Sequence, residues 1–184
     1  MGKIGVIYGS DTGCTEDVTQ VLKSKLEQTR HQIEVLEVHE TFSTEHFRKC
    51  DLLILGVPTW YDGDLQSDWE DYFPTFENID FSGQIVAIYG LGDQIGYDQY
   101  FIDGVGILAK VVIDNGGTVI GNWSADGYDH TQSKALLDEN TFYGLAIDED
   151  NEPELTEGRL DDWLQKVLEE WRAVILGISL EVSD

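Results

Sequence analysis

Apolar positions along the chain follow two alternating periods, which predict strands followed by helices. Short continuous apolar runs, typical of buried parallel strands, occur at 4–8, 52–57 and 85–89. The run at 33–38 alternates apolar with acidic residues, as an edge strand does. Apolar residues at helical spacing predict helices over 16–28, 98–115 and 160–171, and shorter helices near 44–49 and 66–73.

This repeated order of strand and helix predicts an α/β fold, in which a doubly wound parallel sheet carries helices on both faces. A fifth strand begins at 118–121, and a further apolar run at 145–147 resumes it. We expect one domain over residues 1–172. No role is assigned to 173–184, which either extends the last helix or frays. Ligands of such sheets bind beyond the carboxyl ends of the strands, so the loops there are the candidate site.

The loop after the first strand has the composition of an anion site. It runs Gly9-Ser10-Asp11-Thr12-Gly13-Cys14-Thr15. Backbone N–H groups, hydroxyls and a helix N-terminus bind phosphate without a cation. The loop holds no Lys or Arg and is one residue too short for a Walker loop, which favours a terminal monophosphate that is held and not transferred. An ordinary turn capped by Thr15 is an equally good interpretation of the loop alone.

Two later strand-end loops each offer an aromatic side chain. Trp60 follows the third strand and Tyr97 follows the fourth. Either could have a simple structural role, Trp60 as cover for a strand end and Tyr97 as the start of a helix. Together they can sandwich a planar ring one loop away from the phosphate loop. FMN, a planar heterocycle on a chain ending in phosphate, matches this arrangement.

The glycines after the fourth strand imitate a dinucleotide fingerprint but do not form one. Gly90, Gly92 and Gly96 are spaced one residue too widely, and the fingerprint belongs to the first strand–helix turn. We therefore reject a dinucleotide site at this loop.

Charge is the second informative property of the chain. Its 184 residues include 11 basic and 36 acidic ones, for a formal net charge of −25. Such a surface repels nucleic acid and anionic membranes and attracts basic proteins, although solubility or a salty environment also explains it. The acidic residues cluster at 62–71 and 148–157.

Cys14 and Cys50 have neither metal nor redox spacing, and we find no signal peptide or membrane span, so a cytoplasmic protein with reduced thiols is expected.

Several motifs, in order, resemble those of flavodoxins of the long-chain type. They are residues 10–15, 58–60, 92–97, 123–128 and 144–150, and the resemblance runs from 3 to about 171. It implies the strand order 2-1-3-4-5, with FMN at the switch between strands one and three, and an insertion near 123–144 that splits strand five. The family more often has Asn or Lys where this chain has Cys14.

The resemblance also implies a role for each site residue. The phosphate would be held by Ser10, Thr12, Gly13, Cys14 and Thr15. The ring would lie between Trp60 and Tyr97, with its edge lined by Thr59, Tyr61, Gly63, Gly92 and Asp93. Asp148 would approach the ribityl chain. Asp11, Pro58, Asp62, Gly90 and Leu91 complete the predicted cofactor loops. The peptide between Tyr61 and Asp62 would turn when the flavin is reduced.

The implied function is a low-potential one-electron carrier whose non-covalent FMN cycles mainly between semiquinone and hydroquinone. No nucleophile elbow or metal spacing is visible, and a catalytic residue is not predicted. A phospho-receiver domain fits poorly because Pro58-Thr59 and Asn122-Trp123 stand where it needs an acid and a Lys. An NAD(P)H quinone reductase of related fold is the other alternative. The expected partners of the monomer are basic redox proteins: ferredoxin–NADP reductase, photosystem I, nitrogenase reductase or pyruvate oxidoreductase.

Overall fold

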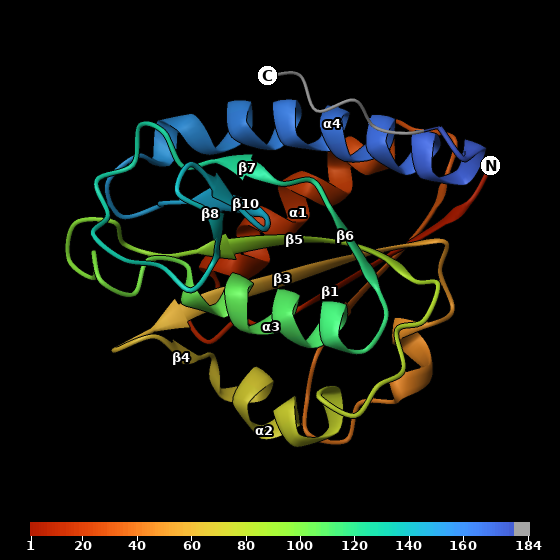
Figure 1. Cartoon of the computed structure of the whole chain (residues 1–184), viewed down its shortest axis with the longest axis horizontal. Coiled ribbons are helices and arrows are strands. Elements are labelled where there is room, and N and C mark those ends of the chain that lie inside the picture. Colours follow the sequence, from red (N-terminus) through yellow and green to blue (C-terminus); the bar gives the residue numbers. More distant parts are fainter. Residues whose placement is uncertain (179–184) are drawn as a thin grey trace.

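A parallel sheet lies at the centre of the computed structural model, which describes residues 1–178 (Figure 1). Its strands run in the order β2-β1-β3-β5, and two short strands, β6 and β10, pair with successive parts of the outer edge of β5. Their bounds are β1 Lys3–Tyr8, β2 Gln32–Glu37, β3 Leu52–Trp60, β5 Ile85–Leu91, β6 Thr118–Ile120 and β10 Leu145–Ile147. The predicted doubly wound sheet is confirmed, with β2 at one edge as its alternating pattern indicated.

The last position of the sheet is occupied by a split strand. β6 pairs with the first half of β5 through Ile85–Thr118, and β10 pairs with the second half through Tyr89–Leu145. Between them, residues 121–144 form a small antiparallel sheet in the order β7-β9-β8. Its strands are β7 Trp123–Ser124, β8 Leu136–Asp138 and β9 Thr141–Phe142. The predicted insertion in strand five is therefore present, and it places new chain beside the carboxyl ends of the sheet.

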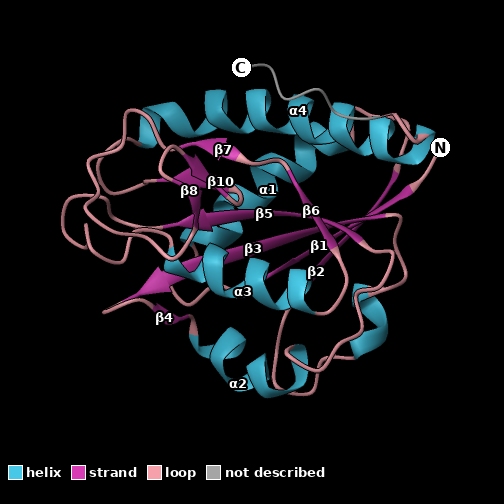
Figure 2. Cartoon of the chain, in the orientation of Figure 1, coloured by secondary structure: helices cyan, strands magenta, loops and turns pink. Residues whose placement is uncertain are grey.

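Helices cover the two faces of the sheet (Figure 2). α1 (Cys14–Leu26) and α4 (Thr156–Leu176) pack on one face, where Leu22, Trp163 and Val167 are fully buried. α2 (Ser67–Phe76) and α3 (Asp103–Asp114) pack on the other face in a core rich in aromatic rings. A short 3₁₀ helix, η1 (Thr44–Phe47), precedes β3, and the two-residue strand β4 (Asp64–Leu65) follows β3.

Two helix boundaries differ from those that the sequence pattern predicts. α3 begins at Asp103 rather than 98, because residues 97–102 form successive turns and Ile102 has a positive φ of 49°. α4 begins earlier, at Thr156, and continues past 172 to Leu176, where Gly177 closes it in the left-handed conformation. Residues 179–184 of the predicted extension lie outside the described residues. Among the described helices, none is both long enough and apolar enough to cross a membrane.

Candidate cofactor site

A cleft of about 320 Å³ opens where the strands end. It lies at the edge to which the arrows of β3 and β5 both point in Figure 1, between the loops after β1, β3, β5 and β10. Its lining residues are Asp11, Thr12, Cys14, Thr15, Pro58, Thr59, Trp60, Tyr61, Leu91, Gly92, Asp93, Tyr97, Tyr100, Phe101, Glu149 and Asp150. Four loops far apart in sequence thus meet at the place where doubly wound sheets bind ligands.

The loop after β1 leads directly into the N-terminus of α1. Gly13 has φ of 92°, a left-handed conformation that a residue with Cβ rarely adopts, and α1 begins at Cys14. The Ser10 hydroxyl accepts hydrogen bonds from the N–H groups of Gly13 (3.1 Å) and Glu16 (3.4 Å). The first N–H groups of a helix have no intrahelical acceptor, so this end of the cleft presents positive partial charge.

The same loop is tied to the start of α2. The Asp11 carboxylate accepts hydrogen bonds from Ser67 Oγ (2.6 Å) and from Gln66 Nε2 (2.8 Å). Gln66 is fully buried and caps α2 by accepting from the Trp69 N–H at 3.2 Å. Asp11 therefore holds the loop in place, and its carboxylate already has partners on the protein.

The loop after β3 carries the first aromatic side chain. A tight turn from Trp60 to Gly63 closes with the Gly63 N–H donating to the Trp60 carbonyl at 3.1 Å. It places Tyr61 at φ of 44°, in the left-handed region, with the side chain 68% exposed. The Trp60 indole Nε1 is buried and has no hydrogen-bond partner among the described residues. A buried donor without an acceptor is destabilising, so this N–H is a candidate contact for a bound polar group.

Asp93 shapes the opposite loop, after β5. Its Oδ1 accepts from the N–H groups of Ile95 (2.9 Å) and Gly96 (2.7 Å) and from Asn151 Nδ2 (2.8 Å). Burial opposes ionisation of this carboxyl, but the hydrogen bonds outweigh it and lower the pKa of Asp93. The turn leaves Tyr97 half exposed at the mouth of the cleft, as a ring-covering residue would be.

Asp148 lies behind the cleft wall rather than in it. Its side chain is fully buried and accepts hydrogen bonds from the N–H groups of Gln94 (3.1 Å), Asp150 (3.1 Å) and Asn151 (3.0 Å). Its neighbours Glu149 and Asp150 line the cleft, and the approach of Asp148 to the ribityl chain stays a prediction. Desolvation and the carboxylates of Asp93 and Asp148 raise the pKa of Asp150.

The remaining predicted residues divide into those that line the cleft and those that shape it. Ser10, Gly13, Asp62, Gly63, Gly90 and Asp148 are absent from the lining. Gly90 and Gly92 have packing reasons to lack a side chain, because a Cβ would approach Val105 Cγ2 at 2.3 Å and the Ile102 N at 3.0 Å respectively. Sequence reasoning missed Tyr100 and Phe101, which it assigned to a helix. Their only signal was aromatic character directly after a strand-end loop.

A larger hollow, of about 750 Å³, lies at the other end of the molecule. It is lined by residues that include Met1, His31, Trp171 and Leu176, and by none of the predicted site residues. The smaller cleft is the better candidate because it lies at the carboxyl ends of the strands and at a helix N-terminus. Among residues 1–178, no group of three His, Cys, Asp or Glu side chains could hold a metal ion.

Comparison with known proteins identifies the family. The family model described as Flavodoxin matches residues 6–163. A flavodoxin of Klebsiella pneumoniae is 44% identical over 172 residues, which cover 92% of this chain and 95% of that protein. Flavodoxin 1 of Escherichia coli strain K12 is 42% identical over the same shares, and a flavodoxin of the Picosynechococcus strain PCC 7002 is 42% identical over 91% of this chain and 96% of its own length.

Solved structures agree with the family model. The crystal structure of Fusobacterium nucleatum flavodoxin bound to flavin mononucleotide superposes with a TM-score of 0.85 at 30% identity. The superposition covers 92% of this chain and 99% of that one. The family model, the relatives and the fold all lead to one conclusion, that this chain belongs to the flavodoxin family.

Proposed function

We propose that the protein is a one-electron carrier that holds FMN non-covalently in the cleft between the loops after β1, β3 and β5. The proposal rests on one observation: the loop at the N-terminus of α1, which has no Lys or Arg, lines the same cleft as two loops that carry aromatic side chains. FMN supplies the redox chemistry, because its flavin ring accepts and releases single electrons when bound.

The α1 end of the cleft suits the terminal phosphate. Thr12, Cys14 and Thr15 line it, and the left-handed Gly13 leads directly into the helix N-terminus, whose free N–H groups would bind the phosphate. Glu16 and Asp17, which are exposed in the first turn of α1, neutralise part of the positive end of the helix dipole. A phosphate held this way needs no Lys or Arg, and Cys14 contributes through its backbone.

The other end of the cleft suits a planar ring. Trp60 and Tyr97 line it from different loops, and Tyr100 and Phe101 add apolar surface on the β5 side. The buried Trp60 Nε1 offers a hydrogen bond that the protein leaves unused. Leu91 and Gly92 bring backbone close to the ring edge, and Asp93 contributes negative charge there.

The charge around the cleft favours an electron donor of low potential. Asp62, Asp64 and Asp71 are exposed beside the Trp60 loop, and Asp93 and Asp150 line the opposite side. Negative charge added to a ring among carboxylates is unfavourable, so a second electron is added only at low potential. The partners are redox proteins, and we propose basic ones such as ferredoxin–NADP reductase, which the acidic rim would attract. Cytosolic location remains part of this proposal, supported by Cys14 and Cys50 as free thiols.

Reconstitution with FMN tests the function. We expect the purified chain to bind one FMN and to be yellow, and to pass single electrons from a reductase to an acceptor protein. It should not oxidise NADPH when no reductase is present. Rapid NADPH oxidation by the chain alone would favour a quinone reductase-like enzyme, and a colourless chain that cannot be loaded would overturn the proposal.

A further inference from the structure

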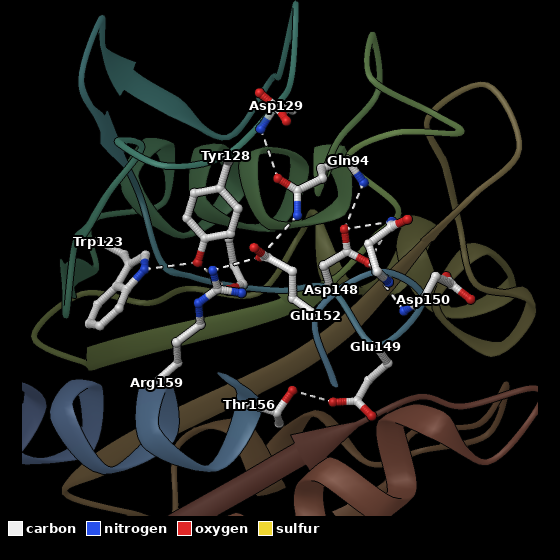
Figure 3. Close-up of polar contacts among 12 residues, drawn as sticks. Gln94, Trp123, Tyr128, Asp129, Asp148, Glu149, Asp150, Glu152, Thr156 and Arg159 are labelled. Atoms are coloured by element: carbon white, nitrogen blue, oxygen red, sulfur yellow. Dashed lines mark hydrogen bonds and ion pairs between the residues drawn. The ribbon is translucent and has the colours of Figure 1, made fainter. Parts of the chain in front are cut away.

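Behind the cleft wall, one buried amide connects three separate segments of the chain (Figure 3). Gln94 is 3% exposed, and each of its side-chain functions has a partner. Its N–H donates to Asp148 Oδ2 at 3.1 Å, its Nε2 donates to Glu152 Oε2 at 3.0 Å, and its Oε1 accepts from the Asp129 N–H at 2.7 Å. These contacts join the loop after β5 to the loop after β10 and to the insertion.

We propose that Gln94 is a positioning residue for the cofactor cleft, which orients the wall formed by residues 93–97 and 148–152 without touching the ligand. The inference rests on the proposed FMN site. Gln94 directly follows Asp93 and precedes Tyr97 by three positions, and both of these residues line the cleft. A shift of the Gln94 side chain would therefore move the loop that covers one face of the ring.

The surroundings require an amide at this position. Glu152 Oε2 is also bound by Arg159 Nη2 at 2.7 Å, and that hydrogen bond lowers the pKa of Glu152, so the group facing Gln94 is an ionised acceptor. The Asp129 N–H on the other side requires an acceptor. A primary amide combines an NH2 donor group and a carbonyl acceptor in a single planar group, which no carboxylate or apolar side chain does.

The contacts of Gln94 continue into the insertion. The Arg159 guanidinium lies 4.5 Å from the centre of the Tyr128 ring, and the Tyr128 hydroxyl donates to the Ala146 carbonyl at 2.7 Å. Asp98 and Phe101 accept further hydrogen bonds from Thr131 and Ser133 of the insertion. The insertion in strand five thus packs behind the loop that carries Tyr97, and Gln94 is the buried residue that connects the insertion to the cleft wall.

The substitution Gln94→Glu tests the proposal because it keeps the shape and removes only the donor. The charged groups near the new carboxyl come from each neighbouring segment: Asp93 of its own loop, Asp129 of the insertion, Asp148 and Glu152 after β10, and Arg159 of α4. At about pH 8 the ionised carboxyl would repel Glu152 and Asp148, and we expect FMN to bind about tenfold more weakly than to the wild type. At about pH 5.5 a shared proton restores the hydrogen bond to Glu152, and the ratio should fall to about twofold.

The matched control is Gln165→Glu, which changes the same Gln–Glu hydrogen bond (Gln165 Nε2 to Glu169 Oε1, 3.0 Å) on the exposed face of α4. Its FMN dissociation constant should equal that of the wild type at both pH values. The double variant Gln94→Glu/Glu152→Gln exchanges donor and acceptor and should recover most of the affinity lost at about pH 8. It also keeps the test valid if the single variant fails to fold.

The outcomes separate this inference from the proposed function. A wild type that binds no FMN would overturn the function. A wild type that binds FMN, with a ratio for Gln94→Glu that is independent of pH or a double variant without recovery, would overturn only the positioning role of Gln94.

Discussion

The two walls of the cleft are built in different ways. In the wall after β1 and β3, two turns close over three positions each, Ser10 with Gly13 and Trp60 with Gly63. Long-range hydrogen bonds from Ser67 and Gln66 to Asp11 also tie this wall to α2. The wall after β5 and β10 is held by Gln94, whose partners lie 35, 54 and 58 positions away. The turns of the first wall therefore follow from local sequence, whereas the orientation of the second wall depends on the completed fold.

This difference decides how each wall should respond to substitution. Changes in the first wall should act locally on the ligand, with small effects on stability. Changes in the second wall should leave buried donors or acceptors without hydrogen-bond partners and so lower the stability of the whole domain. The following predictions test this contrast.

The largest effect is expected from Asp148→Ala. The substitution leaves the buried N–H group of Gln94 and the partly buried N–H groups of Asp150 and Asn151 without their acceptor. The free energy of unfolding of the apoprotein should therefore fall by about 2–4 kcal/mol. Urea unfolding measures it. The control Asp138→Ala removes an exposed carboxylate whose one hydrogen bond within residues 1–178 comes from the Asn140 N–H, and it should cost about 1 kcal/mol or less. Equal losses would show that the second wall has no special dependence on its buried network.

A smaller effect is expected from the acidic rim beside the first wall. Converting exposed Asp62, Asp64 and Asp71 to Asn should slow electron transfer from a basic reductase about tenfold at low ionic strength, with little effect on stability. The difference should shrink as the Debye length falls from about 30 Å at 0.01 M salt to about 10 Å at 0.1 M.

The control for the rim converts three exposed acids on other segments to amides. They are Glu77, Glu139 and Asp162. Stopped-flow electron-transfer rates of the two triple variants are compared across ionic strength. Equal losses of rate would mean that the net charge of −25 attracts the reductase without favouring docking at the cleft.

Gly13→Ala tests the turn into α1. A Cβ at φ of 92° meets no neighbouring atom, so its effect is backbone strain of about 1–2 kcal/mol. We expect FMN to bind about tenfold more weakly, because the strained turn displaces the N–H groups that face the phosphate. Gly158→Ala, in open space within α4, should instead stabilise the chain by about 0.5–1 kcal/mol. Unchanged affinity in Gly13→Ala would contradict the assigned phosphate end.

The smallest effect concerns the turn at Tyr61. Its φ of 44° strains a residue with a side chain, and a turn that changes on reduction would move more easily with Gly. Tyr61→Gly should raise the first one-electron potential of bound FMN by tens of millivolts, since ~1 kcal/mol corresponds to about 40 mV for one electron. Tyr61→Ala removes the same ring but keeps Cβ, so spectroelectrochemistry should show no comparable rise. A rise in both variants would assign the effect to the ring.

Much of the fold was predictable because the relevant signals are local. Continuous apolar runs marked the central strands, and the alternating run over 33–38 marked the edge strand β2. The two halves of strand five appeared as short apolar runs at 118–121 and 145–147. The start of α3 was misplaced because residues 98–102 are compatible with a helix, whereas turn hydrogen bonds and contacts with the insertion hold them as turns.

The candidate site divides in the same way. The phosphate loop and both aromatic loops were predicted because glycines, hydroxyls and aromatic residues follow strands at the correct places. Asp148 was expected near the ligand because its motif resembles that of flavodoxins, and the structure shows its carboxylate accepting hydrogen bonds from backbone N–H groups. Gln94 gave no signal of its own, since a single glutamine acquires meaning only when segments 35 to 58 positions away meet it.

The most direct test of the account is to titrate the apoprotein with FMN, riboflavin and FAD and compare dissociation constants. If the α1 end holds a terminal phosphate, FMN should bind at least about a hundredfold more tightly than riboflavin. FAD should bind poorly, because its phosphate is no longer terminal. Equal affinity for FMN and riboflavin would contradict the assignment of residues 10–15 to the phosphate, and with it the claim that this cleft is built for FMN.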